Sequence, residues 1–403
     1  MKLLHTLALA TLSAVASSAH ATTYTVNDAG SGADSNLNDG MCSTANPGNG
    51  TTCTLRAAIQ EANSDNGAHV IKFAPAVTKI TLTASLPTIT APVVLDGTTA
   101  NVASGGRVEI DGNAVSGCIA LADTDTVAHT DGATGSTVKN LVVRRCSGAG
   151  IDLSGHGYTI TGNRVGTNPG ASSGSSATDA NSAAGISVSG TIPPPAAPSI
   201  TSLLATLPQG FAGVQSLQAA LQALLTPVAK PNLILGNVVS GNMANGIHVF
   251  GQSTANTIVA GNIVGLSQDG LSAVPNGRGP GGSVNRAGIR VSGTAWGNFI
   301  GPGNIVSGNL GDGIALDPGA VLLPNFVAGN LVGLGSAPGA DVGNAVNGIS
   351  VDTFPTTSAP VNVTKIAAII GPANTISDNK STVDTLLDVT NGDTSGGMII
   401  TGS

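Results

Sequence analysis

A short phrase of alternating apolar and polar positions recurs along the chain from residue 150 onward. Each copy is a Gly, an apolar residue, one variable residue and a second apolar residue, as in NGIHV and AGIRV. The first apolar residues of the copies are Ile151, Ile186, Ile247, Ile289, Ile314, Ile349 and Met398. Because side chains alternate between the two faces of a strand, each apolar pair points inward and the residue between them points outward. Each copy therefore predicts a short strand with one buried face.

A second phrase, Asn-x-Val or Asn-x-Ile, recurs between the copies of the first. Its Asn residues are Asn163, Asn237, Asn262, Asn304, Asn330 and Asn374. The shortest interval in both phrases is 25 residues, from Ile289 to Ile314 and from Asn237 to Asn262. Strands repeated at such a period are typical of a solenoid, in which each coil stacks on the next. Residues 96–403 are therefore predicted to form an all-β solenoid.

The recurring Gly and Asn residues are predicted to have structural roles. The Gly before each Ile marks a corner where the backbone needs a positive φ or a close approach to its neighbour. The Asn of each Asn-x-Val is expected at an equivalent turn, where the side-chain amides can stack on one another and bond to neighbouring backbone.

The interval from Ile186 to Ile247 is 61 residues long and contains an insertion. Residues 192–230 open with a Pro-rich lead, IPPPAAPSI, and continue with apolar residues at three- and four-residue spacing. These apolar residues are Val214, Leu217, Leu221, Leu224 and Val228. The spacing predicts an amphipathic helix that packs against the solenoid wall. A lid over a groove is the functional alternative, because long insertions often carry function.

The first 21 residues have the pattern of a secretory signal peptide. Lys2 gives a basic start, residues 7–15 are largely apolar, and Ala19 and Ala21 are small residues at cleavage spacing. No later segment is apolar over the about 20 residues that a membrane-spanning helix needs. The mature protein is therefore predicted to be exported and to lack a transmembrane segment.

Residues 22–95 are predicted to form an N-terminal cap and the first strands. The run CTLRAAIQEAN at 53–63 has Thr54 as an N-cap and Leu55, Ala58 and Ile59 on one helical face. Apolar runs at 70–73, 80–82, 86–89 and 93–97 predict the strands that follow.

The helical run also carries a resemblance to a known family. Residues 53–58, Cys-Thr-Leu-Arg-Ala-Ala, resemble the Cys-Ser-Leu-Arg-Glu-Ala (CSLREA) motif of exported bacterial right-handed parallel β-helix proteins, although Ala57 stands where the family has Glu. The GNxVSGN coils are similar to those of the pectin-lyase-like superfamily. The resemblance implies a right-handed parallel β-helix with an N-terminal capping helix and, in this chain, one helical insertion. It further implies export to the periplasm, cell surface or medium of a bacterium, and diverse surface roles rather than one reaction.

Four cysteines in an exported chain most simply form two disulfides. Cys42 and Cys53 bracket a loop rich in Gly, Asn and Pro, while Cys118 and Cys146 are 28 residues apart and could join adjacent coils. Free thiols and the other two pairings remain open. None of the cysteines has zinc-site spacing with histidines.

Composition limits the partners of this chain. Only 9% of its residues are charged, the net charge is −7, and Lys and Arg are scattered, with Arg144 and Arg145 the one adjacent pair, whereas nucleic-acid binders need a clustered basic surface. Nucleic acid is therefore excluded as a partner. Aromatic residues make up 2%, so a ligand site must rely mainly on polar side chains and backbone.

The strand register predicts two outward columns, with neighbouring residues about 4.8 Å apart. The first column is Asp152, Ser187, His248, Arg290, Ala315 and Ser350, and the second is Ser154, Ser189, Phe250, Ser292, Asp317 and Asp352. Asp312 and Asn347 lie two residues before an Ile in neighbouring coils. The titratable residues of these columns are therefore expected to form one polar patch.

Two kinds of chemistry fit this patch. As an enzyme site, Asp317 and Asp352 could bind Ca²⁺ or share a proton, while Arg290 or His248 could act as base or hold a uronate carboxylate. As a solvated face, the same residues only keep the outside of the solenoid polar. No cofactor other than Ca²⁺ is predicted.

Three titratable residues outside the patch are not interpreted as catalytic. His156, in a Gly-His-Gly, is interpreted as a loop residue, and Glu61 and Glu109 as acids with no second acid beside them.

The sequence thus favours an exported binding or adhesion solenoid that contacts glycans or cell surfaces. The alternative is a polysaccharide lyase or glycoside hydrolase of the pectin-lyase-like kind. The last coil ends in GGMIITGS with no capping element, which predicts self-association, a covering loop, or a chain that continues beyond residue 403.

Overall fold

The computed structural model describes residues 21–44, 52–64, 67–99, 105–123, 132–168, 179–191, 230–279, 286–317, 324–353, 366–371, 373–380, 388–391 and 397–400. The predicted signal peptide and the predicted helix of the insertion lie outside the described residues.

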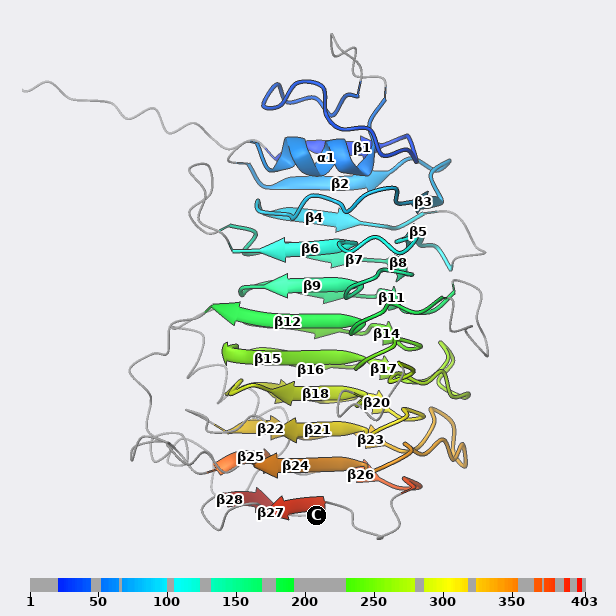
Figure 1. The fold of residues 1–403 in the computed structure, drawn as a ribbon, viewed down its shortest axis with the longest axis vertical. Coiled ribbons are helices and arrows are strands. Elements are labelled where there is room, and N and C mark those ends of the chain that lie inside the picture. The colour runs from blue at the N-terminus through cyan, green and yellow to red at the C-terminus, as the bar shows by residue number, and fades with distance from the viewer. Residues whose placement is uncertain are drawn as a thin grey trace, which may run out of the picture.

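The described strands form three parallel sheets that run the length of the molecule (Figure 1). Sheet 1 contains β1 (Thr23–Val26), β2 (His69–Phe73), β4 (Val93–Asp96), β7 (Thr137–Lys139), β10 (Thr159–Thr161), β13 (Asn232–Leu235), β16 (Thr257–Ala260), β19 (Phe299–Ile300), β22 (Asn325–Val327), β25 (Ile366–Ile370) and β28 (Gly397–Ile400). Sheet 2 contains β3 (Lys79–Thr81), β5 (Val108–Asp111), β8 (Leu141–Arg144), β11 (Arg164–Val165), β14 (Val238–Val239), β17 (Ile263–Val264), β20 (Ile305–Val306), β23 (Leu331–Val332) and β26 (Thr375–Ile376). Sheet 3 contains β6 (Ile119–Ala122), β9 (Ile151–Ser154), β12 (Ile186–Thr191), β15 (Ile247–Ser253), β18 (Ile289–Ser292), β21 (Ile314–Asp317), β24 (Ile349–Thr353) and β27 (Asp388–Asn391).

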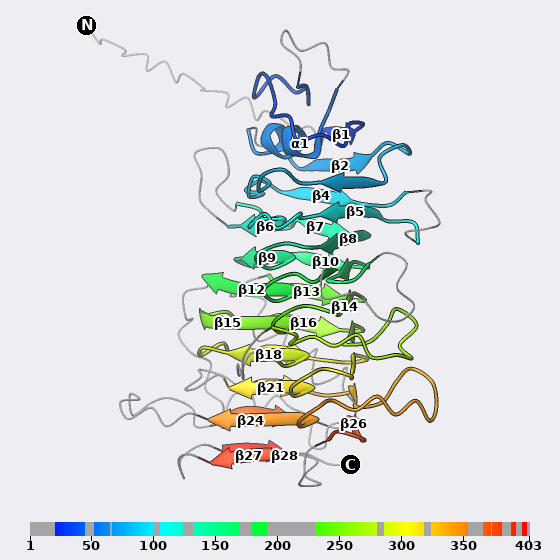
Figure 2. The ribbon, with the colours of Figure 1, turned by 45° about the vertical axis from the view of Figure 1, so that its right-hand side comes forward.

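From β4 onward the chain visits sheets 1, 2 and 3 in turn, and each strand pairs with the equivalent strand of the next coil. Figure 2, turned by 45°, shows the same stack of coils from another side. This connectivity is that of a parallel β-helix, which confirms the predicted fold class. The right-handed winding stays a prediction.

The core runs along the axis between the three sheets. On sheet 3 it is made by the apolar pair of each Gly-Ile-x-Val phrase, such as Ile247 with Val249 and Ile289 with Val291, all fully buried. Sheet 1 departs from the rule of polar outer positions in the middle coils. Ile258, Phe299 and Phe326 alternate with core residues and so face outward, yet each is at most 2% exposed. Sheet 3 therefore offers the more polar outer face in these coils.

Asparagine side chains form a ladder between sheets 1 and 2, as the second phrase predicts. Each Asn of the ladder is one rung, and as far as Asn330 its Nδ2 donates to the Oδ1 of the Asn in the next coil, at 2.8–3.1 Å. The rungs are Asn163, Asn237, Asn262, Asn304, Asn330 and Asn374. A second ladder lies between sheets 2 and 3 and consists of Asn181, Asn242, Asn276, Asn309, Asn344 and Asn379. Both ladders satisfy buried backbone groups at the corners of the coils.

The Gly before each Ile is required by close approach and not by a positive φ. A Cβ on Gly246 would lie 2.6 Å from the carbonyl oxygen of Gly288 and 2.6 Å from Cγ1 of Val264. Gly288 meets the equivalent atoms of Gly313 and Val306 at 2.8 and 2.6 Å. Of the two reasons that the sequence left open, a positive φ or a close approach, the structure therefore selects the close approach.

One helix, α1 (Leu55–Ala62), lies across β1 and β2 at the N-terminal end of the stack (Figure 1). Thr54 is its N-cap, as predicted, and its hydroxyl accepts from the backbone N–H of Ala57. Glu61 is fully buried and accepts from the backbone N–H groups of Asn38 and Gly40, at 2.8 and 2.6 Å. Glu61 thus ties α1 to the N-terminal loop. Of the predicted first strands, only 86–89 is wrong, because Ile89 there makes a single bridge.

Both simplest disulfide pairings are confirmed. Cys42 is bonded to Cys53 and Cys118 to Cys146. Cys118 immediately precedes β6, and Cys146 lies between β8 and β9. Because β6 pairs with β9, the second disulfide joins adjacent coils.

Candidate functional site

The outer face of sheet 3 brings the predicted site residues together on neighbouring coils. This face is toward the viewer in Figure 1, where β15, β18 and β21 lie one below another. His248 in β15 is the register partner of Arg290 in β18, and Ser292 in β18 is the partner of Asp317 in β21. The predicted backbone register of both columns is therefore confirmed as far as β21.

A hollow of about 270 Å³ lies on this face beside His248 and Phe250. The two rings stack, with their centroids 4.7 Å apart and 23° between their planes. Ser187 and Asn245 supply polar atoms to the lining, and four alanines that precede β9, β12 and β15 make up the rest. The volume is close to the lower end of small-molecule pockets, roughly 300 Å³. It suits a single group of the size of one sugar ring.

The sequence predicted His248 and Phe250 in the columns but missed the hollow itself. The space exists because small residues, such as Ala183 and Ala244, precede the Gly-Ile corners of successive coils. Alanines two or three residues before the Ile of three successive coils were the available signal. Without the packing of the corners it could not be distinguished from ordinary small residues at a turn.

His248 is placed to form hydrogen bonds as a neutral ring. Its Nε2 lies 2.8 Å from the Ser292 hydroxyl. Burial, together with the nearby positive charge of Arg290, lowers the pKa of His248 to about 4. A Ser and a His at this distance have the spacing of a nucleophile and its base, but an active base is normally supported by a carboxylate that stabilises the imidazolium. Arg290 has the opposite effect, so the arrangement suits hydrogen bonding to hydroxyl groups.

Arg290 and Asp317 are bound to each other. The guanidinium Nε donates to Asp317 Oδ1 at 3.1 Å, and Nη2 donates to the other carboxylate oxygen. Arg290 is 9% exposed. Two parallel hydrogen bonds of this kind are the strong form of an ion pair. Both residues are therefore brought together as predicted, but each offers much of its charge to the other.

For Asp352, the predicted partner of Asp317, the structure describes the backbone but not the side chain. Asp352 lies in β24, next to β21, and its side chain is outside the described part of the chain. The Asp317–Asp352 pair and its Ca²⁺ stay predictions. Over the residues that the structure describes, no group of three or more His, Cys, Asp or Glu is placed to hold a metal ion. Asp312 accepts from the Asn347 N–H at 3.0 Å and from the Ser350 hydroxyl at 2.9 Å, which links two coils.

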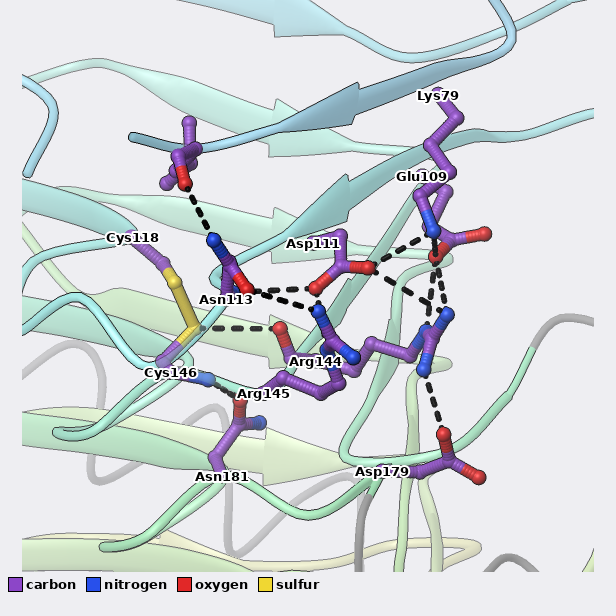
Figure 3. A network of polar contacts seen from close by, with 11 residues as sticks. Lys79, Glu109, Asp111, Asn113, Cys118, Arg144, Arg145, Cys146, Asp179 and Asn181 are labelled. Carbon is purple, nitrogen blue, oxygen red and sulfur yellow. Dashed lines mark hydrogen bonds and ion pairs between the residues drawn. A yellow bond between two sulfur atoms is a disulfide. The ribbon is translucent and has the colours of Figure 1, made fainter. Parts of the chain in front are cut away.

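A second cluster, the sheet 2 network, was not predicted (Figure 3). It consists of Lys79, Glu109, Asp111, Arg144, Arg145 and Asp179. Arg144 lies at its centre, 2.7 Å from Glu109 and 2.5 Å from Asp179, while Lys79 lies 2.8 Å from Asp111. The interpretation that Glu109 has no second acid beside it is wrong. Strand register places Glu109 next to Lys79 and Asp111 next to Arg144, which brings together charges that are scattered in the sequence.

His156 lies in the turn between β9 and β10, as the interpretation of a loop residue requires. Its backbone N–H donates to Asp123 Oδ2 at 2.6 Å, and its ring Nδ1 lies 2.9 Å from the same oxygen. The Tyr158 hydroxyl donates to the other oxygen of Asp123. Burial and the Asp123 charge raise the pKa of Tyr158 far above its ordinary value. These contacts fix the turn, and Asp123 was missed because it is 33 residues away in the chain.

Comparisons with known proteins leave the family open. No family model matches the sequence, and no curated protein matches it. One solved structure that matches is a double mutant of the periplasmic alginate epimerase AlgG, at 13% sequence identity and a TM-score of 0.35. The match covers 84% of this chain and 71% of that chain. A likeness at this level carries no argument, and the fold rests on the strand pairing described above.

Within the described ranges, no helix is long and apolar enough to cross a membrane.

Proposed function

We propose that this chain is an exported glycan-binding solenoid and that a polysaccharide binds on the outer face of sheet 3 at the hollow beside His248. The observation that carries the proposal is the stacked pair of His248 and Phe250 at the wall of this hollow. Aromatic rings offer an apolar face to the C–H groups of a sugar. Ser187, Asn245 and the neutral His248 ring then offer hydrogen-bonding atoms for its hydroxyls.

Two further features support the proposal. Outward positions of sheet 3 near the hollow are rich in Ser, including Ser154, Ser189 and Ser292, which share one column along the axis with Phe250. A long polymer with a repeating set of hydroxyls matches a surface that repeats in the same direction. Two disulfides are typical of proteins that work in oxidising compartments, which supports export.

Replacing Phe250 with Ala is expected to weaken polysaccharide binding about tenfold, because aromatic anchors at the centre of a site often contribute more than about 1.4 kcal/mol. The measurement is affinity electrophoresis of the mature protein through gels that contain neutral or acidic polysaccharides. Thr159→Ala, on the outer face of sheet 1, is the matched control and should bind like the unchanged protein.

The same incubations test the alternative of a lyase or hydrolase. New reducing ends or unsaturated uronide absorbance, lost on substitution of Asp317 or His248, would establish an enzyme in place of a binding protein. If Phe250→Ala is retarded as strongly as the unchanged protein in every gel that retards the unchanged protein, the proposed site is overturned.

A further inference from the structure

The charges around the hollow point to a particular class of ligand. Arg290 is the cation beside His248 in the first column, and its guanidinium is held by Asp317 through two hydrogen bonds. The side chains of both residues are about nine-tenths buried, with 11% and 12% of their surfaces exposed. A buried, bidentate pair keeps its charges together, because separating them leaves each charge without compensation in a poor solvent.

The remaining groups at the hollow are uncharged. The lining consists of Ser187, Asn245, Phe250, alanines and His248. The low pKa of His248 means that its ring is neutral at pH 7. A carboxylate brought into this space would lose water without gaining a cation that is available to it. A hydroxyl or hydroxymethyl group would lose less and find matching donors and acceptors.

We infer that the polysaccharide bound at this hollow is uncharged, and that Asp317 is a specificity-determining residue which enforces this by holding the charge of Arg290. The inference rests on the proposed function and adds its ligand class. Asp317 acts through Arg290 and is therefore a positioning residue. A uronate would be favoured only if the guanidinium were released toward the hollow.

The experiment compares matched polymers that differ in the oxidation of one carbon: galactan with polygalacturonate, mannan with polymannuronate, and glucan with polyglucuronate. Affinity is measured by gel retardation at fixed ionic strength, since charge effects are screened by salt. The unchanged protein is expected to bind the neutral member of a pair about tenfold more tightly. Asp317→Asn is expected to lose this preference or reverse it, because Arg290 then keeps a charge that the carboxamide cannot neutralise.

The readout is the ratio of two affinities, which a general loss of structure does not reverse. The double variant Arg290→Gln with Asp317→Asn removes both charges and should keep the preference for the neutral polymer. Tighter binding of the uronate by the unchanged protein would overturn this inference while leaving the glycan site in place. Equal ratios in the unchanged protein and in folded Asp317→Asn would also overturn it. If Asp317→Asn does not fold, the matched pairs on the unchanged protein decide the question. Retardation by none of the polymers would overturn the proposed function and this inference together.

Discussion

Replacing Asn262 with Ala is expected to lower the free energy of unfolding by about 4 kcal/mol, because it strands several buried polar groups. Asn262 is fully buried in the middle of the first ladder. Its Oδ1 accepts from the backbone N–H and the Nδ2 of Asn237, at 2.9 and 3.0 Å. Its own Nδ2 donates to the Ile234 carbonyl at 2.8 Å and to Asn304 Oδ1 at 3.0 Å. Alanine removes these four bonds, together with a fifth from Nδ2 to the Ala260 carbonyl at 3.1 Å, and supplies none. Each stranded group costs about 1–3 kcal/mol.

Urea unfolding followed by circular dichroism measures this loss. Asn36→Ala is the control, because Asn36 is exposed and its side-chain amide donates to Asp39 in the same loop. This variant should change the free energy of unfolding by less than about 0.5 kcal/mol. A loss below about 1 kcal/mol for Asn262→Ala would show that the ladder is not a main source of stability.

Replacing Arg144 with Met is expected to cost about 3–5 kcal/mol at pH 7, the usual result of removing one partner from a buried group of charges. Glu109 and Asp179 would lose their shortest contacts with a cation, at 2.7 and 2.5 Å. Lys79 and Arg145 would still contact Asp111. The companion variant Arg144→Met with Glu109→Gln and Asp179→Asn removes the stranded charges and should recover most of the loss. Lys72→Met, an exposed cation on β2, is the control.

The sheet 2 network should also stabilise the protein in a way that depends on pH, through the carboxyl group of Asp111. Burial would raise the pKa of Asp111, but hydrogen bonds from Lys79 and Arg145 outweigh it and leave this pKa below its ordinary value. A carboxyl whose pKa is lowered in the folded state stabilises the protein above its unfolded pKa, about 3.9, and loses this contribution as pH falls through the folded value. The difference in the free energy of unfolding between the unchanged protein and Asp111→Asn, which has no charge to titrate, should therefore shrink below about pH 4. A difference that stays constant from pH 7 to pH 3 would show that lost packing, and not charge, is the cause.

The repeating parts of this chain could be predicted from the sequence because the same two phrases recur in many coils, so a structure inferred for one coil applies to the others. The Gly-Ile-x-Val phrase predicted the inward pair Ile247 and Val249 and the outward neighbours His248 and Arg290, and the register confirms both. The Asn-x-Val phrase predicted the first ladder residue by residue. Period, alternation and turn chemistry are properties of a strand and its neighbour, so they are visible in a single sequence.

Features that depend on which unequal coils lie side by side could not be predicted in the same way. Glu109 and Lys79 meet because β3 and β5 pair, although no repeated phrase marks either strand. The hollow depends on how Ala183 and Ala244 pack at two corners, and its electrostatics depend on the bond between Arg290 and Asp317. The sequence predicted that Arg290 and Asp317 lie in one patch. Only their contact in the structure shows that the charge of Arg290 is compensated by Asp317.

Nuclear magnetic resonance of protein with labelled histidine rings tests the central claim, that a glycan binds at the hollow beside His248, most directly. His156 is an internal control, because its ring is bound to Asp123 in the turn after β9. We expect the His248 ring to stay neutral down to about pH 4 and its signals to shift when a retained neutral polysaccharide is added, while those of His156 stay in place. Ligand-induced shifts at His156 with none at His248 would contradict the account.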